Sequence, residues 1–357
     1  MSETALPRGP EDVDSEWLSG ALRQRFPGVR VAGVEVIEQR EVTNSHAKLR
    51  VSYEEADGAP STMFCKLPPG DPDRREAIIR TGMGEREAYF YQELAPEVGL
   101  RIPGVYAAQV RGDGNFILLL EDLDAAGCVV SDGGQGIPLD SAARALEDLA
   151  ALHLRYLDPD VRAAEVPWIP TTRSASTYGS VMLQYGLDNH RDRLSDGFAE
   201  IAELCISHPG ELQELWHRGP QTVIHGDPHI GNLFLDGNRA GFLDWGIINV
   251  NTPMRDVSYF LTMALTIEDR RSGERGLLAH YLDIWNSGGG TPLSMDEAWL
   301  AHRVHAAYTV LASCQVVTFP VDASPQRRVF AAAFLDRAQA AVDDLEARGA
   351  IRLSAGL

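Results

Sequence analysis

The chain has 357 residues, 44% of them hydrophobic, which is enough to build two lobes with separate cores. Its 51 acidic and 32 basic residues give a formal net charge of −19, which excludes nucleic acid and anionic membranes as expected partners. The four cysteines show no pair spacing, and neither a signal peptide nor a bilayer-spanning apolar run is evident, so we expect a cytoplasmic protein; its oligomeric state is left open.

The N-terminal part of the chain predicts a sheet with a flanking helix. A helix is expected over residues 14–26, with Asp14 or Ser15 as its cap. Alternating apolar residues predict strands over 31–39 and 48–54. The loop between them contains no glycine.

The apolar run over residues 62–68 predicts a further strand, which carries Lys66. The chain has only two lysines beside 30 arginines, so a position that keeps lysine favours a compact point charge. The alternative is a solvated lysine on an edge strand.

Residues 82–99 predict an amphipathic helix, because Ala88, Tyr91 and Leu94 fall on one face. Glu87 flanks this apolar stripe. An ordinary surface position for Glu87 is the alternative, since glutamate favours helices wherever it is exposed.

A buried strand is expected within residues 115–124, followed by a glycine-rich loop at 127–138. A long helix over residues 140–157 should then start at Asp140 or Ser141. The remainder reads as mostly helical.

Residues 223–246 hold the strongest functional signal, HGDPHIGN followed by LDWG. Asp227 can accept a hydroxyl proton, while Asn232 and Asp244 are hard oxygen donors of the kind that Mg²⁺ prefers. The apolar runs 233–235 and 241–243, with a turn between them, predict a hairpin that carries Asp244 back beside Asn232. Because phosphoryl transfer needs positioning and charge neutralisation above all, it is the first reaction to consider.

These motifs resemble the catalytic and metal-binding loops of the aminoglycoside phosphotransferase, choline kinase and ecdysteroid-kinase-like group. The resemblance implies an α+β, two-lobed protein-kinase-like fold. Residues 1–120 would form an N-terminal nucleotide-binding lobe with an antiparallel sheet and one main helix, 121–126 the hinge, and 127–357 a helical C-terminal lobe with the catalytic loops and the substrate pocket. It also implies an ATP- and Mg²⁺-dependent kinase acting on a hydroxyl of a small molecule, such as an antibiotic, an amino alcohol or a steroid-like metabolite.

The resemblance assigns roles residue by residue. Asp227 would be the catalytic base, and Asn232 and Asp244 the Mg²⁺ ligands. Supporting residues would be His225, His229 and Asp256.

In the N-terminal lobe, the resemblance makes Lys66 the phosphate-binding lysine and Glu87 its partner, with Glu85 as the alternative. The loop residues Asn44, Ser45 and His46 are candidates for phosphate contacts, Ser45 above all; Asn44 and Ser45 are equally good turn residues. The backbone of Glu121 to Leu123 would receive adenine.

Three other functions remain open. A protein kinase is disfavoured because only eleven residues separate Asp244 from Asp256, too few for a long activation segment. A nucleotide-binding module without catalysis is disfavoured because base, metal ligands and lysine are all present. A zinc hydrolase would use His225, Asp227 and His229. Acceptor specificity is expected to reside in residues 160–220 and 265–335.

Overall fold

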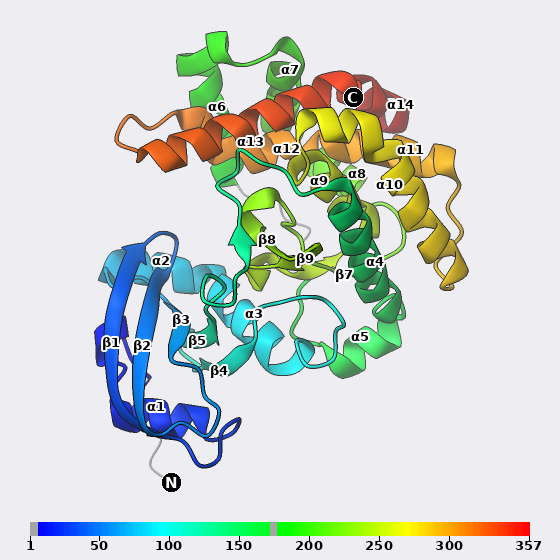
Figure 1. Ribbon diagram of the computed structural model, residues 1–357. Helices are drawn as coiled ribbons and strands as arrows, with labels where there is room; N and C mark the ends of the chain where they lie inside the picture. Colours follow the sequence, from blue (N-terminus) through cyan, green and yellow to red (C-terminus); the bar gives the residue numbers. More distant parts are fainter. Residues whose placement is uncertain (1–5, 172–176) are drawn as a thin grey trace. The chain divides into compact units, whose positions relative to one another are not determined.

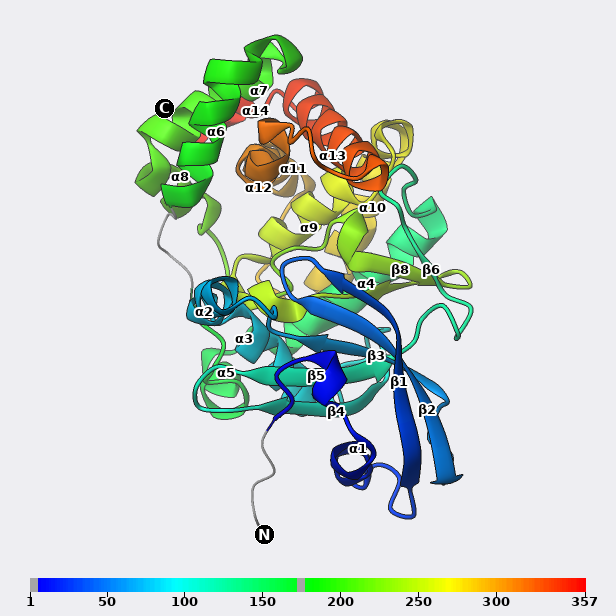
Figure 2. The same ribbon diagram turned by 90° about the vertical axis from the view of Figure 1, so that its left-hand side faces the viewer.

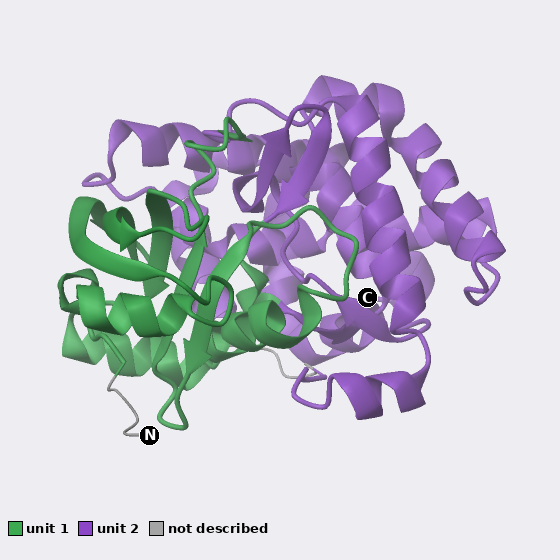
Figure 3. Ribbon diagram, turned by 60° about the horizontal axis from the view of Figure 1, so that its bottom comes forward, with its two compact units in different colours: residues 1–129, 243–247 green, residues 130–242, 248–357 purple. Residues whose placement is uncertain are grey.

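The computed structural model describes residues 6–171 and 177–357 and divides the chain into two compact units (Figure 3). Unit 1 comprises Met1–Val129 and Leu243–Ile247, and unit 2 comprises Val130–Phe242 and Ile248–Leu357. Residues 172–176, part of the predicted acceptor region, lie outside the described residues. Within the described ranges, no helix is both long and apolar enough to cross a membrane.

Unit 1 is built on one five-stranded antiparallel sheet with the strand order β1, β2, β3, β5, β4 (Figure 1, Figure 2). Helix α1 packs against the sheet around a core that includes Leu18, Leu49 and Met63. The elements are η1 (Pro10–Asp12), α1 (Ser15–Leu22), β1 (Arg30–Glu41), β2 (Ser45–Glu55), β3 (Thr62–Leu67), α2 (Pro72–Thr81), α3 (Met83–Tyr89), η2 (Phe90–Leu94), β4 (Val105–Val110), β5 (Phe116–Glu121) and η5 (Trp245–Ile247).

Two helices of unit 1 differ from the prediction. Asp14 caps α1 as expected, accepting from the backbone N–H of Trp17 at 2.8 Å, but the helix ends at Leu22. Residues 23–25 form turns instead, and the N–H groups of Arg25 and Phe26 both donate to the Leu22 carbonyl. Helix α2 was not predicted. The helix is flanked by the capping residues Asp71 and Gly82, but it buries no side chain, so no apolar period marks it in the sequence.

Helix α3 and the short π-helical segment η2 bury the predicted stripe of Ala88, Tyr91 and Leu94. Gly84 lets α3 approach β5 closely, because a Cβ atom there would lie 1.9 Å from the ring of Phe116. Glu87, one turn further on, is consequently buried.

Unit 2 is mainly helical around its own apolar core, which includes Phe198, Tyr259 and Val310. The predicted caps of α4 were wrong: the helix follows Pro138 without a side-chain cap, and Ser141 Oγ instead donates to the carbonyl of Asn238 at 2.9 Å. The helices are α4 (Leu139–Arg155), α5 (Pro159–Glu165), α6 (Thr177–His190), η3 (Arg191–Arg193), α7 (Asp196–Ser207), α8 (Pro209–Trp216), η4 (Ile230–Asn232), α9 (Pro253–Met263), α10 (Ile267–Ser287), α11 (Met295–Ala306), α12 (Tyr308–Ala312), η6 (Ser313–Thr318), α13 (Pro325–Asp344) and α14 (Ala347–Ala355).

The strands of unit 2 frame the predicted catalytic segment. Strands β8 (Leu233–Asp236) and β9 (Arg239–Phe242) form the predicted hairpin, with Gly237 at φ +59° in its two-residue turn. Strand β7 (Thr222–Ile224) pairs with β10 (Asn249–Asn251). The remaining strand, β6 (Val129–Val130), spans the chain boundary between the units.

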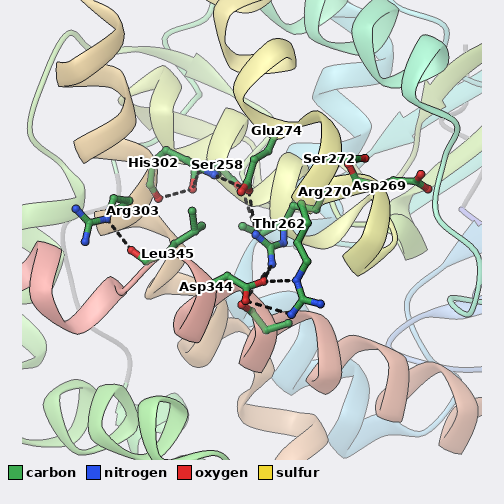
Figure 4. Close-up of polar contacts among 12 residues, drawn as sticks. Ser258, Thr262, Asp269, Arg270, Ser272, Glu274, His302, Arg303, Asp344 and Leu345 are labelled. Atoms are coloured by element: carbon green, nitrogen blue, oxygen red, sulfur yellow. Dashed lines mark hydrogen bonds and ion pairs between the residues drawn. The ribbon is translucent and has the colours of Figure 1, made fainter.

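A buried polar network joins α10 to α13 and α11 (Figure 4). Arg270, 1% exposed, pairs with Glu274 at 3.0 Å and with Asp344, while Glu274 also lies 3.4 Å from the ring of His302. Ser258 closes the network by contacting the other ring nitrogen of His302 at 3.0 Å. Arg270, Glu274 and Asp344 therefore each have an oppositely charged partner within this network.

We expect Arg270→Leu to lower the free energy of unfolding by about 3–5 kcal/mol, because it leaves buried Glu274 without its cationic partner. Guanidinium denaturation monitored by circular dichroism measures this change. Arg271→Leu is the matched control, since Arg271 also pairs with Asp344 but is exposed, and its effect should be much smaller. Equal effects of the two variants would contradict the expectation.

Candidate active site

Lys66 lies on β3, which is flanked by β2 and β5 and is therefore not an edge strand. Its ammonium lies 2.6 Å from Glu87 of α3 and 3.2 Å from Asp244. Lys66 and Glu87 are only 4% and 2% exposed. The solvated alternatives for both residues are thus excluded, and Glu87 rather than Glu85 is the partner.

The charges of Lys66, Glu87 and Asp244 shift the pKa values of Lys66 and Glu87. Burial alone would lower the pKa of Lys66, but the carboxylates of Asp244 and Glu87 outweigh it and raise that pKa above its ordinary value. Burial raises the pKa of Glu87, an effect that the Lys66 ammonium opposes. The two carboxylates thus favour the charged form of the Lys66 ammonium, a compact positive charge of the kind that can bind phosphate oxygens.

Asp244 belongs to the segment Leu243–Ile247, which α3 and η2 hold in place. The Trp245 ring stacks on Phe90 with centroids 3.8 Å apart and planes 7° apart. The Gly246 carbonyl accepts from Arg86 Nε at 2.9 Å. Asp244 itself has φ +58°, a left-handed backbone that is uncommon outside glycine and frequent at functional sites. Its side chain remains 47% exposed.

The last residue before β2 and the first residue of that strand carry two buried polar atoms, Asn44 Oδ1 and Ser45 Oγ, that have no hydrogen-bond partner among the described residues. An unsatisfied buried polar atom is costly, so turn formation alone does not explain these side chains. Burial, with the charges of Lys66 and Arg40, lowers the pKa of His46 to about 3. His46 therefore adds no positive charge to this turn at neutral pH.

The predicted hinge groups are partly engaged. The Glu121 N–H donates to the Gly104 carbonyl at 2.7 Å, and the Leu123 carbonyl accepts from Cys128 N–H at 2.9 Å. The Glu121 carboxylate pairs with Arg101 at 2.9 Å. These bonds fix the shape of the segment and leave fewer of its backbone groups for a ligand than expected.

In unit 2, the predicted base and metal ligand lie together. Asn232 Nδ2 donates to the backbone carbonyl of Asp227 at 3.0 Å and to its carboxylate at 3.1 Å. The Asp227 side chain is 25% exposed, and His229 Nε2 lies 3.5 Å from its Oδ2. The loop thus offers Asp227 as a carboxylate held by its neighbours.

Asp256, which is fully buried on α9, holds this loop through hydrogen bonds to its backbone. It accepts from the backbone N–H groups of His225 at 2.6 Å and Gly226 at 2.8 Å, and it lies 3.4 Å from His153. Burial alone would raise the pKa of Asp256, but the hydrogen bond and charge of His153, followed by His225 and the Gly226 N–H, lower it overall. The N–H of Asp227 donates to His225 Nδ1 at 3.2 Å, which completes the support.

The zinc alternative finds no geometric support. His225 is buried and accepts from Asp227 N–H, and His229 Nδ1 accepts from Gly231 N–H at 3.0 Å. Over residues 6–171 and 177–357, no three His, Cys, Asp or Glu side chains are grouped so as to hold a metal ion.

Sequence reasoning missed several residues near these groups. Lys48 Nζ lies 3.0 Å from Asp122 in the predicted hinge. Because the chain has only two lysines, the sequence could have indicated Lys48 as a candidate site residue. Tyr259 and Arg255 lie on α9 near Asp256, and burial, with a contribution from Asp227, raises the pKa of Tyr259. Only the three-residue spacing from Asp256 to Tyr259 pointed to this neighbourhood.

Several known proteins are similar to this chain in sequence or in structure. An uncharacterized kinase-like protein of Caenorhabditis elegans is 23% identical over 287 residues, covering 70% of this chain and 72% of that protein. A solved structure from Ralstonia eutropha JMP134, provisionally assigned as an aminoglycoside phosphotransferase, is 15% identical with a TM-score of 0.52, covering 93% of this chain and 98% of that one. The choline kinase LicA of Streptococcus pneumoniae gives 15% identity and a TM-score of 0.49, over 88% and 94% of the two chains.

The Ralstonia structure supports the predicted α+β protein-kinase-like fold, which is thereby confirmed. The model of the phosphotransferase enzyme family matches residues 44–297, which is more than half of the chain and contains every predicted site residue. The chain therefore belongs to the phosphotransferase enzyme family, as its catalytic motif predicted.

Proposed function

We propose that the protein transfers the γ-phosphate of ATP, in the presence of Mg²⁺, to a hydroxyl group of a small molecule. The observation that carries this proposal is the loop of unit 2, where a partly exposed Asp227 is bonded to Asn232 and braced by buried Asp256. A carboxylate held in this way can accept the proton of an acceptor hydroxyl as the hydroxyl oxygen attacks phosphorus.

Asn232 and Asp244 are the proposed Mg²⁺ ligands. Because Asn232 Nδ2 is occupied by Asp227, the side-chain oxygen Oδ1 is the atom left to bind a cation. Asp244 adds an exposed carboxylate, so the donors are the hard oxygens that Mg²⁺ prefers. When bound, the ion would neutralise charge on the phosphates.

Lys66 is the proposed contact for the nucleotide phosphates, held by Glu87, and Ser45 adds a hydroxyl from the turn. The backbone of Glu121 to Leu123 remains the proposed adenine contact. A protein substrate is not favoured, because the residues between Asp244 and Asp256 form η5, β10 and the first turn of α9.

The proposal is tested by screening hydroxylated metabolites and antibiotics for ATP-dependent phosphorylation, detected by mass spectrometry of the acceptor. We expect at least one phosphorylated product, whose formation stops when EDTA removes Mg²⁺. Turnover that proceeds unchanged in EDTA, or transfer to generic peptides alone, would contradict the proposal.

We expect Lys66→Met to lower kcat/KM for ATP by roughly 100- to 1,000-fold, because a preorganised charge on the phosphates is removed. Lys66→Arg should rescue little, since a planar guanidinium does not fit a site built around a point charge between two carboxylates. Initial-rate kinetics with varied ATP measure both variants. Full activity of the arginine variant would show that charge alone is required there.

A further inference from the structure

Arg255 on α9 is a buried cation without an anionic partner. The residue is 8% exposed, and its Nη1 has no hydrogen-bond partner among the residues that the structure describes. Within residues 6–171 and 177–357, no ion pair includes Arg255. The guanidinium instead lies over the ring of Tyr308 and 6.0 Å from the centroid of Tyr259. Arg255 is thus paired with the ring and hydroxyl of Tyr308 and with no carboxylate, so its positive charge is not neutralised by an anion.

The two tyrosines connect Arg255 to the proposed base. Their centroids are 5.6 Å apart, and the ring of His229, beside Asp227, meets Tyr259 edge-on at 6.2 Å. Burial raises the pKa of both hydroxyls; Asp227 adds to this effect and Arg255 opposes it. The cation and the proposed base therefore act on the same two rings.

Other aromatic rings extend this group. Phe334 meets His229 at 5.2 Å, and Phe330 lies 5.7 Å from Phe334. Phe330 is only partly buried, as is Tyr308. His305 adds no charge, because burial, with a contribution from Arg255, lowers its pKa to about 4. Arg255 thus brings a positive charge to this aromatic group.

An aromatic group beside a reacting centre would ordinarily attract a cationic ligand through the ring faces. Here Arg255 covers the face of Tyr308 and contributes a positive field. An acceptor with an ammonium group near its hydroxyl would lose that aromatic contact and be repelled. An uncharged or acidic acceptor would keep the apolar contacts and avoid the repulsion.

We propose that the acceptor is an uncharged or anionic alcohol with an apolar or sugar-like body, and that Arg255 selects against amino alcohols and aminoglycosides. This inference rests on the proposed function, because it takes Asp227 as the base that marks the acceptor position.

Pairs of acceptors, each with one cationic and one uncharged member, test the inference. Choline is compared with 3,3-dimethylbutan-1-ol, and kanamycin with its N-acetylated form, in the presence of Mg²⁺ and a non-hydrolysable ATP analogue. Calorimetry measures binding, and kcat/KM is measured with ATP. We expect the wild-type protein to prefer the uncharged member of each pair by on the order of tenfold, the factor that two like charges about 10 Å apart produce at an effective dielectric constant near 20.

Arg255→Met should bring the ratio of preference for the uncharged over the charged acceptor towards one, whereas Arg255→Lys should leave that ratio unchanged. Arg275→Met is the matched control, since Arg275 lies 4.4 Å over Trp299 on other elements and should leave the preference unchanged. A wild-type preference for the charged members overturns the inference and needs no variant. A preference that survives Arg255→Met in folded protein also overturns it. Absence of any transfer, with charge-selective binding intact, counts against the proposed function and not against this inference.

Discussion

We expect Asp227→Asn to lower kcat by about 1,000-fold or more at saturating ATP and acceptor. The amide keeps the shape of the side chain beside Asn232 but cannot accept the hydroxyl proton, and general-base catalysis contributes roughly 10²- to 10⁴-fold. Because Asp227 is not a proposed contact of the nucleotide, ATP should bind with unchanged affinity. Single-turnover phosphorylation and calorimetry with a non-hydrolysable analogue measure the two quantities.

Asp236→Asn serves as the control, because Asp236 is an exposed carboxylate at the end of β8 and the exchange is chemically identical. Its kcat should stay within about twofold of the wild type. If Asp227→Asn retained most of its activity, Asp227 would not be the base, and if it lost ATP binding in parallel, its role would be structural.

Local patterns predicted much of the fold. The β8–β9 hairpin, the strand around Lys66 and the cap at Asp14 each follow from a few neighbouring residues. Helix α2 was not predicted because it buries no side chain and so has no apolar pattern. Only the capping residues Asp71 and Gly82 indicate it in the sequence. The start of α4 was predicted wrongly because Ser141 donates to the carbonyl of Asn238, 97 positions away, and no local sequence pattern indicates such a contact.

The same division applies to the candidate site. The resemblance to the kinase group implied that a strand lysine pairs with a helix glutamate, and the rare lysine and the face of the helix indicated Lys66 and Glu87 for these positions. The position of Arg255 could not, because its aromatic partner Tyr308 lies on a different helix. Likewise, Asn44 and Ser45 are ordinary turn residues in the sequence, and only their burial without partners separates a ligand role from a turn role.

The second large effect is expected at Asp256. Asp256→Ala should lower the free energy of unfolding by about 3–5 kcal/mol, because two buried N–H groups, of His225 and Gly226, lose their acceptor together with His153. It should also lower kcat by about 100-fold or more, since Asp227 then loses its fixed position. Denaturant titration and initial rates measure the two effects on one preparation.

The pH dependence of stability separates this role of Asp256 from simple packing. The folded protein holds the pKa of Asp256 below its ordinary value of about 3.9, so its stabilising contribution is present above about pH 4 and is lost as the pH falls through the lower folded value. Asp256→Ala should therefore flatten the acid side of the stability profile as well as lowering it. Asp256→Asn keeps one acceptor oxygen and should lie between the two proteins in stability. A parallel downward shift of the whole profile would instead mean that the carboxylate contributes volume but not charge, and the loop that presents Asp227 would then be held by packing.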